Sequence, residues 1–301
     1  MYHGILIIDK EAGFTSHDVV AKLRGICKQK RIGHTGTLDP DAVGVLPVCL
    51  GSATGICDML ADQDKEYEAV LQLGLTTDTQ DASGVVISRC EPTVTEAQAE
   101  QVIASFTGSY QQIPPMYSAL KVNGKKLYEL AREGKEIERK AREVTIEKIE
   151  IISMTLPEVT MRVVCSKGTY IRTLCHDIGQ ALSCGGIMKS LKRTRVGSFG
   201  INQAIKLDQA EEAMKKDQLH AVMIPIDRMF AQLAAVQVKE QYYKLLLNGN
   251  RLYPDQLLPG AGWSKGEQVR VYSHDGCFFG VFGFRERENC LQPVKMFFTQ
   301  M

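Results

Sequence analysis

Hydrophobic and polar positions change period several times along the first part of the chain, and each change marks an expected element. Residues 4–8 form an apolar run that predicts a short strand, followed by a turn at Gly13. Ser16 can cap a helix whose apolar positions recur close to every 3.6 residues: Val19, Val20, Leu23 and Ile26. Apolar and polar residues then alternate over residues 67–73, which predicts a second strand.

Later segments mix helix and strand patterns without a regular order. Thr95 and Gln98 make a capping box ahead of the apolar positions Val102, Ile103 and Phe106. Residues 144–146 and 159–164 predict strands. The second of these runs through Gly168 into a helix with apolar positions at Ile171, Leu174, Ile178 and Leu182. The absence of β-α alternation favours an α+β fold over a doubly wound sheet.

Two segments interrupt this pattern. Residues 111–142 are basic, open with Pro114-Pro115, and look inserted between sheet elements, as functional insertions often are. The second break lies near residues 224–226, beyond which a helix at 240–247, ended by Gly249, and a glycine-rich β pattern at 269–284 predict a small β-rich module. We therefore expect a large first domain at 1–232 and a small second domain at 235–301.

Composition places the chain among ordinary globular proteins. Its 301 residues are comfortable for two domains, with 44% apolar and 24% charged residues. No apolar run is long enough for a membrane span and no secretory signal is evident, so we expect a cytoplasmic protein. The nine cysteines form no CxxC pair and accompany no paired His cluster, which predicts mostly buried, reduced thiols and no metal site.

Charge is distributed unevenly although the net charge is only +1. Residues 22–34 carry five Lys or Arg and no acid, and residues 111–142 carry eight against four Glu. A third basic cluster consists of Lys189, Lys192, Arg193 and Arg195. Such local basic surfaces fit a polyanionic ligand. Solvated helix faces are the alternative interpretation of any one cluster.

Asp39 precedes Pro40 in a glycine-rich loop. Taken alone, an Asp-Pro pair most often starts a turn. Here Gly33 and Gly36 allow a backbone to approach a ligand closely, and Lys30, Arg31 and His34 add positive charge and donors. This combination suits an acid placed beside a phosphate-bearing substrate.

The same loop resembles the signature loop of the bacterial tRNA pseudouridine-55 synthases, the TruB family. The resemblance continues in the family's order through five segments: residues 6–10 with Gly13, Ser16 and Asp18; residues 33–40 with 43–47; residues 65–67; residues 114–121 with Tyr128 and residues 131–134; and residues 168–174. It covers roughly residues 4–200. Residues from about 235 onward are similar to the PUA-like RNA-binding domain that ends these enzymes.

The resemblance implies a pseudouridine synthase catalytic domain with a mixed, largely antiparallel sheet, and a thumb insertion at about 111–142. It implies isomerisation of uridine 55 in the tRNA TΨC loop, with the base flipped out and with no cofactor or metal. Asp39 matches the nucleophile, Arg172 the arginine paired with it, and Tyr67 the active-site tyrosine. A phenol is a poor unaided base at neutral pH, so positioning is the first role expected of Tyr67. Attack on ribose C1′, attack on uracil C6 and a glycal route all remain open.

Further residues of the site follow from the same match. His34 resembles the residue that takes the place of the flipped base, and Tyr170 and Leu191 resemble residues lining the uridine pocket; for Leu191 a plain core leucine is the alternative. Four basic residues are expected on the RNA backbone: Lys121, Lys189, Lys192 and Arg193. The expected partner is the TΨC stem-loop of tRNA, bound by a monomer that needs no other protein and no membrane.

Three departures from the family pattern stand out. Glu11 occupies a position that is usually proline, Gly55 one that is often lysine, and residues 186–188 differ from the usual histidine-containing segment. The loss of a lysine at position 55 removes one phosphate contact expected from the resemblance. Two alternative functions are a guide-RNA-directed pseudouridine synthase and a tRNA-binding chaperone or adaptor. Residues 116–119 and the basic insertion favour the stand-alone enzyme.

Overall fold

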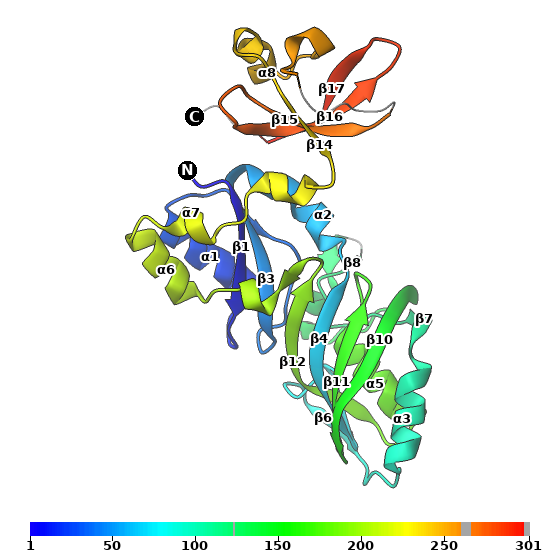
Figure 1. Cartoon of the computed structure of the whole chain (residues 1–301). Coiled ribbons are helices and arrows are strands. Elements are labelled where there is room, and N and C mark those ends of the chain that lie inside the picture. Colours follow the sequence, from blue (N-terminus) through cyan, green and yellow to red (C-terminus); the bar gives the residue numbers. More distant parts are fainter. Residues whose placement is uncertain (123, 260–265, 298–301) are drawn as a thin grey trace.

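The computed structural model describes residues 1–122, 124–259 and 266–297. Its larger body is built on a nine-stranded sheet with helices packed on it, and its smaller body on a separate four-stranded sheet (Figure 1). The chain passes from the larger body to the smaller one after the short helix η3 (Ile226–Phe230).

The large sheet is mixed and largely antiparallel, as the resemblance implies. Its main path runs β1-β3-β12-β4-β11-β10-β7, with β2 paired to β3 and β13 to β12. Every pairing is antiparallel except that of β12 with β3. The strands are β1 Gly4–Lys10, β2 Ile32–His34, β3 Val43–Leu50, β4 Lys65–Leu73, β7 Gly108–Gln112, β10 Arg142–Thr155, β11 Glu158–Cys165, β12 Gly186–Val196 and β13 Phe199–Gly200.

Helix α1 (Ser16–Cys27) begins at Ser16, and its N-cap lies one residue before the predicted one. Thr15 is the N-cap, and its side chain and that of Asp18 form a capping box. The prediction that Ser16 caps this helix is therefore wrong. Ser16 is buried, and its hydroxyl bonds the backbone of Leu38 instead.

Two groups of helices cover the large sheet. Helices α3 (Glu96–Ser105) and α5 (Ile171–Ala181) pack on the face that receives the buried side chains of β4, including Tyr67 and Leu71. Helices α1, α6 (Leu207–Lys215) and α7 (Leu219–Val222) pack against β1 and β3. Alternation along β4 turns Glu66 and Glu68 to the opposite, open face. The predicted capping box of α3 and the predicted helix after Gly168 are confirmed.

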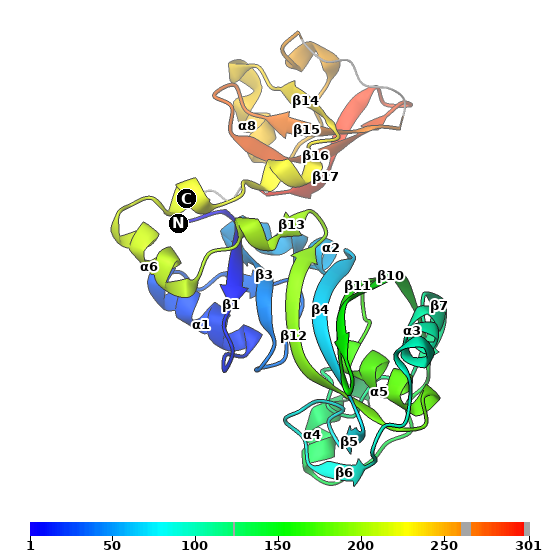
Figure 2. The same ribbon diagram turned by 60° about the horizontal axis from the view of Figure 1, so that its bottom comes forward.

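The basic insertion lies between β7 and β10, as predicted. It contains the hairpin β8 (Lys121–Val122) and β9 (Lys125–Lys126), followed by α4 (Leu127–Arg132). A second hairpin, β5 (Leu75–Thr77) and β6 (Val86–Arg89), follows β4. Figure 2 shows α4 beside this second hairpin, beneath α5.

The smaller body has its own core. Its sheet runs in the order β14-β15-β16-β17, with bounds Ala234–Gln237, Gln268–Tyr272, Phe278–Arg285 and Cys290–Met296. Helix α8 (Tyr243–Leu247), the short helices η4 (Glu240–Tyr242) and η5 (Pro254–Gln256), and Phe279 and Phe282 complete it. The predicted β-rich module is thus observed. The division at 232 and 235 stays a prediction; β14 begins at Ala234.

The thiols agree with the sequence analysis. All nine cysteines are free, and six of them are buried. The described part of the chain holds no group of three or more His, Cys, Asp or Glu placed to bind a metal ion. None of the helices in residues 1–122, 124–259 and 266–297 is long and apolar enough to cross a bilayer.

Candidate active site

Asp39 and Arg172 meet although 133 residues separate them. Asp39 lies in the loop between β2 and β3, and Arg172 is the second residue of α5. Arg172 Nη2 donates to Asp39 Oδ1 at 3.0 Å. The Arg172 side chain is 8% exposed and that of Asp39 is 36% exposed. The arginine is therefore held inside the protein, while the carboxylate remains open to a ligand.

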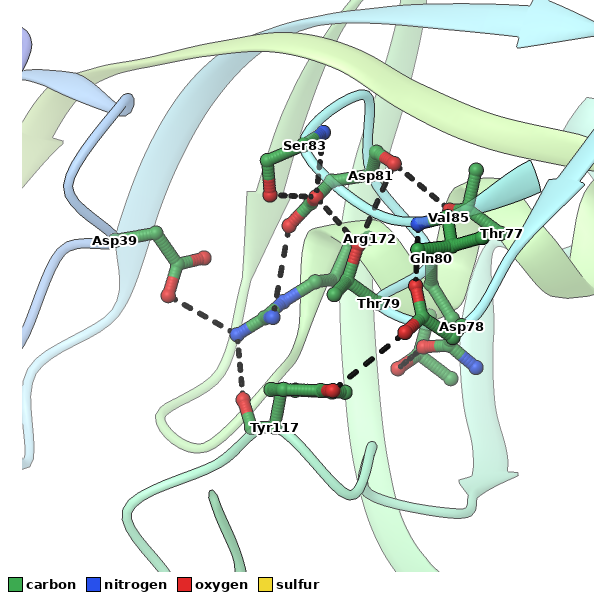
Figure 3. A network of polar contacts seen from close by, with 11 residues as sticks. Asp39, Thr77, Asp78, Thr79, Gln80, Asp81, Ser83, Val85, Tyr117 and Arg172 are labelled. Atoms are coloured by element: carbon green, nitrogen blue, oxygen red, sulfur yellow. Dashed lines mark hydrogen bonds and ion pairs between the residues drawn. The ribbon is translucent and has the colours of Figure 1, made fainter. Parts of the chain in front are cut away.

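Arg172 joins three segments of the chain (Figure 3). Its Nη2 atom also donates to the Tyr117 backbone oxygen at 3.0 Å, which brings the basic insertion to the site. Its Nη1 atom lies 3.6 Å from Asp81 Oδ2, in the turn between β5 and β6. A single buried guanidinium thus holds the Asp39 loop, the insertion and this turn together.

Asp81 is itself fixed by donors on its other oxygen. Its Oδ1 atom accepts hydrogen bonds from Thr79 Oγ1 at 2.7 Å, from Ser83 N at 3.0 Å and from Ser83 Oγ at 2.6 Å. This leaves Oδ2 directed at Arg172 (Figure 3). The neighbouring Asp78 accepts from Val85 N at 2.7 Å and makes no ion pair with Arg172.

The electrostatic surroundings of Asp39 act in both directions. Burial raises the pKa of Asp39 above its ordinary value, and the charges of Asp81 and Asp41 add to this rise. Arg172 and Lys10 oppose it, with Arg172 the larger of the two. A carboxylate in these surroundings is a stronger base and nucleophile than one in water, provided that it is ionised.

Hydrogen bonds with Ser16 and Lys10 fix the backbone of the loop that carries Asp39. Ser16 Oγ accepts from Leu38 N at 2.9 Å. Lys10, which is fully buried, donates to the carbonyl oxygens of Phe14 at 2.6 Å and Pro40 at 2.9 Å. Burial lowers the pKa of Lys10 to about 8. The residues on either side of Asp39 are therefore bonded to the end of β1 and the start of α1.

Tyr67 lies in the core beside Arg193. Burial raises the pKa of Tyr67, and a hydrogen bond and the charge of Arg193 oppose this only in part. The phenol is therefore protonated at neutral pH. Arg193 donates from Nε to the Val45 oxygen at 2.7 Å and from Nη2 to the Gly36 oxygen at 3.3 Å.

Arg193 is 1% exposed. The prediction that it contacts an RNA phosphate is wrong, because its guanidinium is enclosed and its donors are used inside the protein. Its position explains another property of the site: it connects Tyr67 on β4 to the Gly36 turn of the Asp39 loop.

The other predicted pocket residues lie near this centre. Tyr170 precedes α5, and its backbone exchanges two hydrogen bonds with the Gln112 side chain, at 2.8 and 3.0 Å. Leu191 is partly buried against the core that contains Tyr67. His34 ends β2, its Nδ1 atom is buried and unpartnered among the described residues, and burial lowers its pKa.

The predicted lysine contacts are not brought together at this centre. Lys121 is exposed on the insertion. Lys189 is paired with Glu158, and Lys192 stands opposite Glu68 in the register of β12 and β4. Since Glu68 faces away from Tyr67, Lys192 lies on the open face of the sheet. The roles of these three lysines remain predictions.

Sequence reasoning missed two residues that build the site, Asp81 and Gln112. Asp81 sits in a turn-rich stretch, residues 77–84, that reads as an ordinary connection. Gln112 is the last residue of β7 and only 1% exposed. A polar residue just before Pro114-Pro115 carries no distinctive signal. Both become visible only through the contacts that they make.

Comparison with known proteins gives consistent matches over nearly the whole chain. A model described as TruB family pseudouridylate synthase (N terminal domain) matches residues 24–171, and one described as tRNA pseudouridylate synthase B C-terminal domain matches residues 172–231. The tRNA pseudouridine synthase B of Lachnoclostridium phytofermentans is 53% identical, covering 98% of this chain and 99% of the relative. That of Alkaliphilus oremlandii is 47% identical, covering 90% and 89%.

Solved structures show the same fold. An H/ACA RNP bound to a substrate RNA containing 2′-deoxyuridine matches with a TM-score of 0.69 at 26% identity, covering 99% of this chain and 86% of that one. A Cbf5-Nop10-Gar1 complex matches with a TM-score of 0.69 at 28% identity, covering 98% and 85%.

Proposed function

The chain belongs to the TruB family of pseudouridylate synthases, and from that premise we propose that Asp39 is the nucleophile with which it isomerises uridine 55 of the tRNA TΨC loop. The enzyme is an isomerase: the bond between uracil N1 and ribose C1′ breaks, the base turns, and C5 is joined to C1′, while the C5 hydrogen leaves as a proton and N1 gains one. The observation that carries the assignment of Asp39 is its pair with the buried Arg172 at 3.0 Å.

The surroundings of Asp39 support its nucleophilic attack by controlling whether its carboxyl group is ionised or protonated. Attack requires the ionised carboxylate, and Arg172 stabilises that form while burial opposes it. The hydrogen bond from Arg172 to Oδ1 fixes the orientation of the Asp39 carboxylate. Because the Asp39 side chain is 36% exposed, its other oxygen remains accessible to the substrate.

Tyr67 is proposed to position the base. Its phenol remains protonated because burial raises its pKa, so it is unsuited to removing a proton unaided. Arg193 hydrogen-bonds the Tyr67 hydroxyl and, through the Gly36 oxygen, the loop that carries Asp39. The same arginine thus positions the tyrosine that orients the uracil base and the loop that carries the nucleophile.

The RNA is proposed to be gripped between the insertion and the loop. Arg172 already bonds the Tyr117 backbone, which ties the insertion to the catalytic carboxylate. Lys121 is proposed to contact the backbone of the RNA, and His34 to fill the space left by the flipped uridine, which offsets part of the few kcal/mol that flipping costs. Tyr170 and Leu191 are proposed to line the uridine pocket.

The partner is proposed to be the TΨC stem-loop of tRNA, bound by a cytoplasmic monomer without another protein. A guide-RNA-directed enzyme is the nearest alternative, because the solved structures of similar fold include H/ACA complexes. Those chains are only 26–28% identical to this one, whereas the tRNA pseudouridine synthases B reach 53%. The difference supports the stand-alone enzyme.

The test uses purified protein and an unmodified tRNA transcript labelled with tritium at C5 of uridine. We expect the protein alone to release tritium from one uridine per tRNA, because C5 loses its hydrogen when it becomes the glycosidic carbon. A requirement for added guide RNA would refute the stand-alone proposal. Tight tRNA binding without release would favour the chaperone or adaptor alternative.

A further inference from the structure

We propose that Arg31 and Lys295, one from each body of the protein, form a binding site for a backbone phosphate of the tRNA beside Gly55. Arg31 directly precedes β2 of the large sheet, and Lys295 lies on β17 of the small one. The proposal rests on the proposed function, since it takes tRNA as the ligand. It gives the small sheet a direct role in RNA binding, through Lys295 on β17.

Arg31 is positioned by a single hydrogen bond. Its Nε atom donates to Thr54 Oγ1 at 2.8 Å, and Thr54 Oγ1 donates to the Gly51 oxygen at 2.9 Å. Both Thr54 and Gly51 belong to the short helix η1 (Gly51–Ile56). The side chain is exposed, and within the described residues its two Nη atoms have no partner. The guanidinium is therefore oriented and still has donors available for a phosphate.

Lys295 reaches the same helix from the small sheet. A Cβ atom added to Gly55 would lie 3.7 Å from Lys295 Cε and 3.6 Å from the ring of Phe297. Phe297 is 4% exposed and packs with Ala53 and Ile56 of η1 in one hydrophobic cluster. Because this phenylalanine is only two residues away, it holds Lys295 against the catalytic body. Both views show the end of that body that carries α2 (Cys57–Ala61) facing the small sheet (Figure 1, Figure 2).

The two cations are not neutralised by the protein. Neither Arg31 nor Lys295 forms an ion pair within residues 1–122, 124–259 and 266–297, although Asp58 is only three residues from Gly55. Burial lowers the pKa of His3, and the positive charges of the amino terminus and of Arg31 add to this fall. Unpaired, exposed positive charge at a fixed position is what a phosphate contact requires.

The site lies within reach of the catalytic centre. His34 is three positions after Arg31 along extended chain, which is about 10 Å. With His34 in its proposed place beside the flipped uridine, a phosphate at Arg31 would belong to a nearby nucleotide rather than to a distant arm of the tRNA.

The position of Lys295 relates to the presence of glycine at position 55. In the family pattern this position is often lysine, and here the Lys295 side chain reaches Gly55 from β17 with its Cε atom. Gly55 has no side chain to occupy the space, so Lys295 can lie across it. We infer that the charge is retained but supplied by the other body of the protein.

The experiment measures the affinity of Asp39→Asn protein for an unmodified tRNA transcript as a function of salt, which separates binding from turnover. In this background, Lys295→Met keeps an aliphatic side chain and removes the charge. We expect about a three- to tenfold weaker affinity at 50 mM salt and a salt slope reduced by about 0.7–0.9, the value of one phosphate contact. Lys295→Arg should retain the slope. The matched control is Lys244→Met on α8, across the small sheet from η1, which should not change the slope.

A charge swap tests the position itself. Gly55→Lys combined with Lys295→Ala moves the ammonium from β17 to η1, and the Cβ contacts at position 55 are ordinary van der Waals distances. We expect the double variant to recover the slope that Lys295→Ala loses. An unchanged slope in Lys295→Met, or a double variant no better than Lys295→Ala, would overturn the proposal. Failure of the parent protein to bind tRNA would instead refute the proposed function, before any variant is compared.

Discussion

Replacing Asp81 or Arg172 should slow the enzyme in both cases but move its pH profile in opposite directions. Arg172 lowers the pKa of Asp39 and Asp81 raises it. In the proposed mechanism attack requires ionised Asp39, so activity should be present above the pKa of Asp39 and lost as the pH falls through it. Asp81→Asn should therefore extend activity to lower pH, and Arg172→Met should restrict it to higher pH.

The size of the loss follows from the contact between Asp81 and Arg172. Arg172 Nη1 and Asp81 Oδ2 are 3.6 Å apart, which gives about 4–5 kcal/mol of attraction at an effective dielectric constant of about 20. Removing both groups from water offsets much of this, because their side chains are 8% and 13% exposed. A net loss of about 1.5–3 kcal/mol in holding Arg172 on Asp39 corresponds to a rate lower by about 10- to 150-fold.

The assay is single-turnover release of tritium from C5-labelled tRNA at saturating enzyme, repeated from acid to neutral pH. Asp78→Asn is the matched control, because Asp78 lies in the same turn and bonds Val85 N instead of Arg172. In this control the pH at which activity falls on the acid side of the profile, the acid limb, should not change. The reasoning is refuted if the acid limb of Asp81→Asn stays in place or moves to higher pH, or if Asp78→Asn shows the same shift.

Three further variants test the remaining assignments. Asp39→Asn should reduce tritium release by roughly 1,000-fold or more while tRNA binding persists; turnover near the wild-type rate would remove Asp39 as the nucleophile. Tyr67→Phe should retain at least about a tenth of the rate if the phenol positions the base, and should lower stability by about 1–3 kcal/mol because Arg193 loses a buried acceptor; a loss beyond about 100-fold would instead indicate proton transfer. Ser16→Ala should lower the free energy of unfolding by about 1–2 kcal/mol in urea titration, since Leu38 N loses its partner; an unchanged midpoint would contradict this.

Local patterns predicted those elements whose causes are local. The alternation along β4 and the apolar spacing of α1 and α5 follow from the burial of one face of each element, and the capping box of α3 depends on residues three apart. The error at the start of α1 has the same origin. Thr15 and Ser16 are both good caps, and only the contact of Ser16 with Leu38 determines which of them points inward.

The prediction for Arg193 was wrong for a different reason. An arginine among lysines suggests a solvated cluster, but alternation along β12 turns Lys192 and Arg193 to opposite faces of the sheet. Arg193 then meets Tyr67 and the loop at Gly36, which are neighbours only because β12 pairs with both β4 and β3. No local pattern contains that pairing.

The sequence by itself determined the family and the α+β pattern, and it predicted that Arg172 pairs with Asp39, because these are carried by contiguous motifs and by short-range periodicity. The tertiary structure decided which side chains those motifs meet. It placed Asp81 on Arg172, enclosed Arg193, and brought Lys295 to Gly55 across 240 positions of sequence. Such contacts depend on strand order, register and the packing of one body on another, and these are properties of the whole chain rather than of any segment.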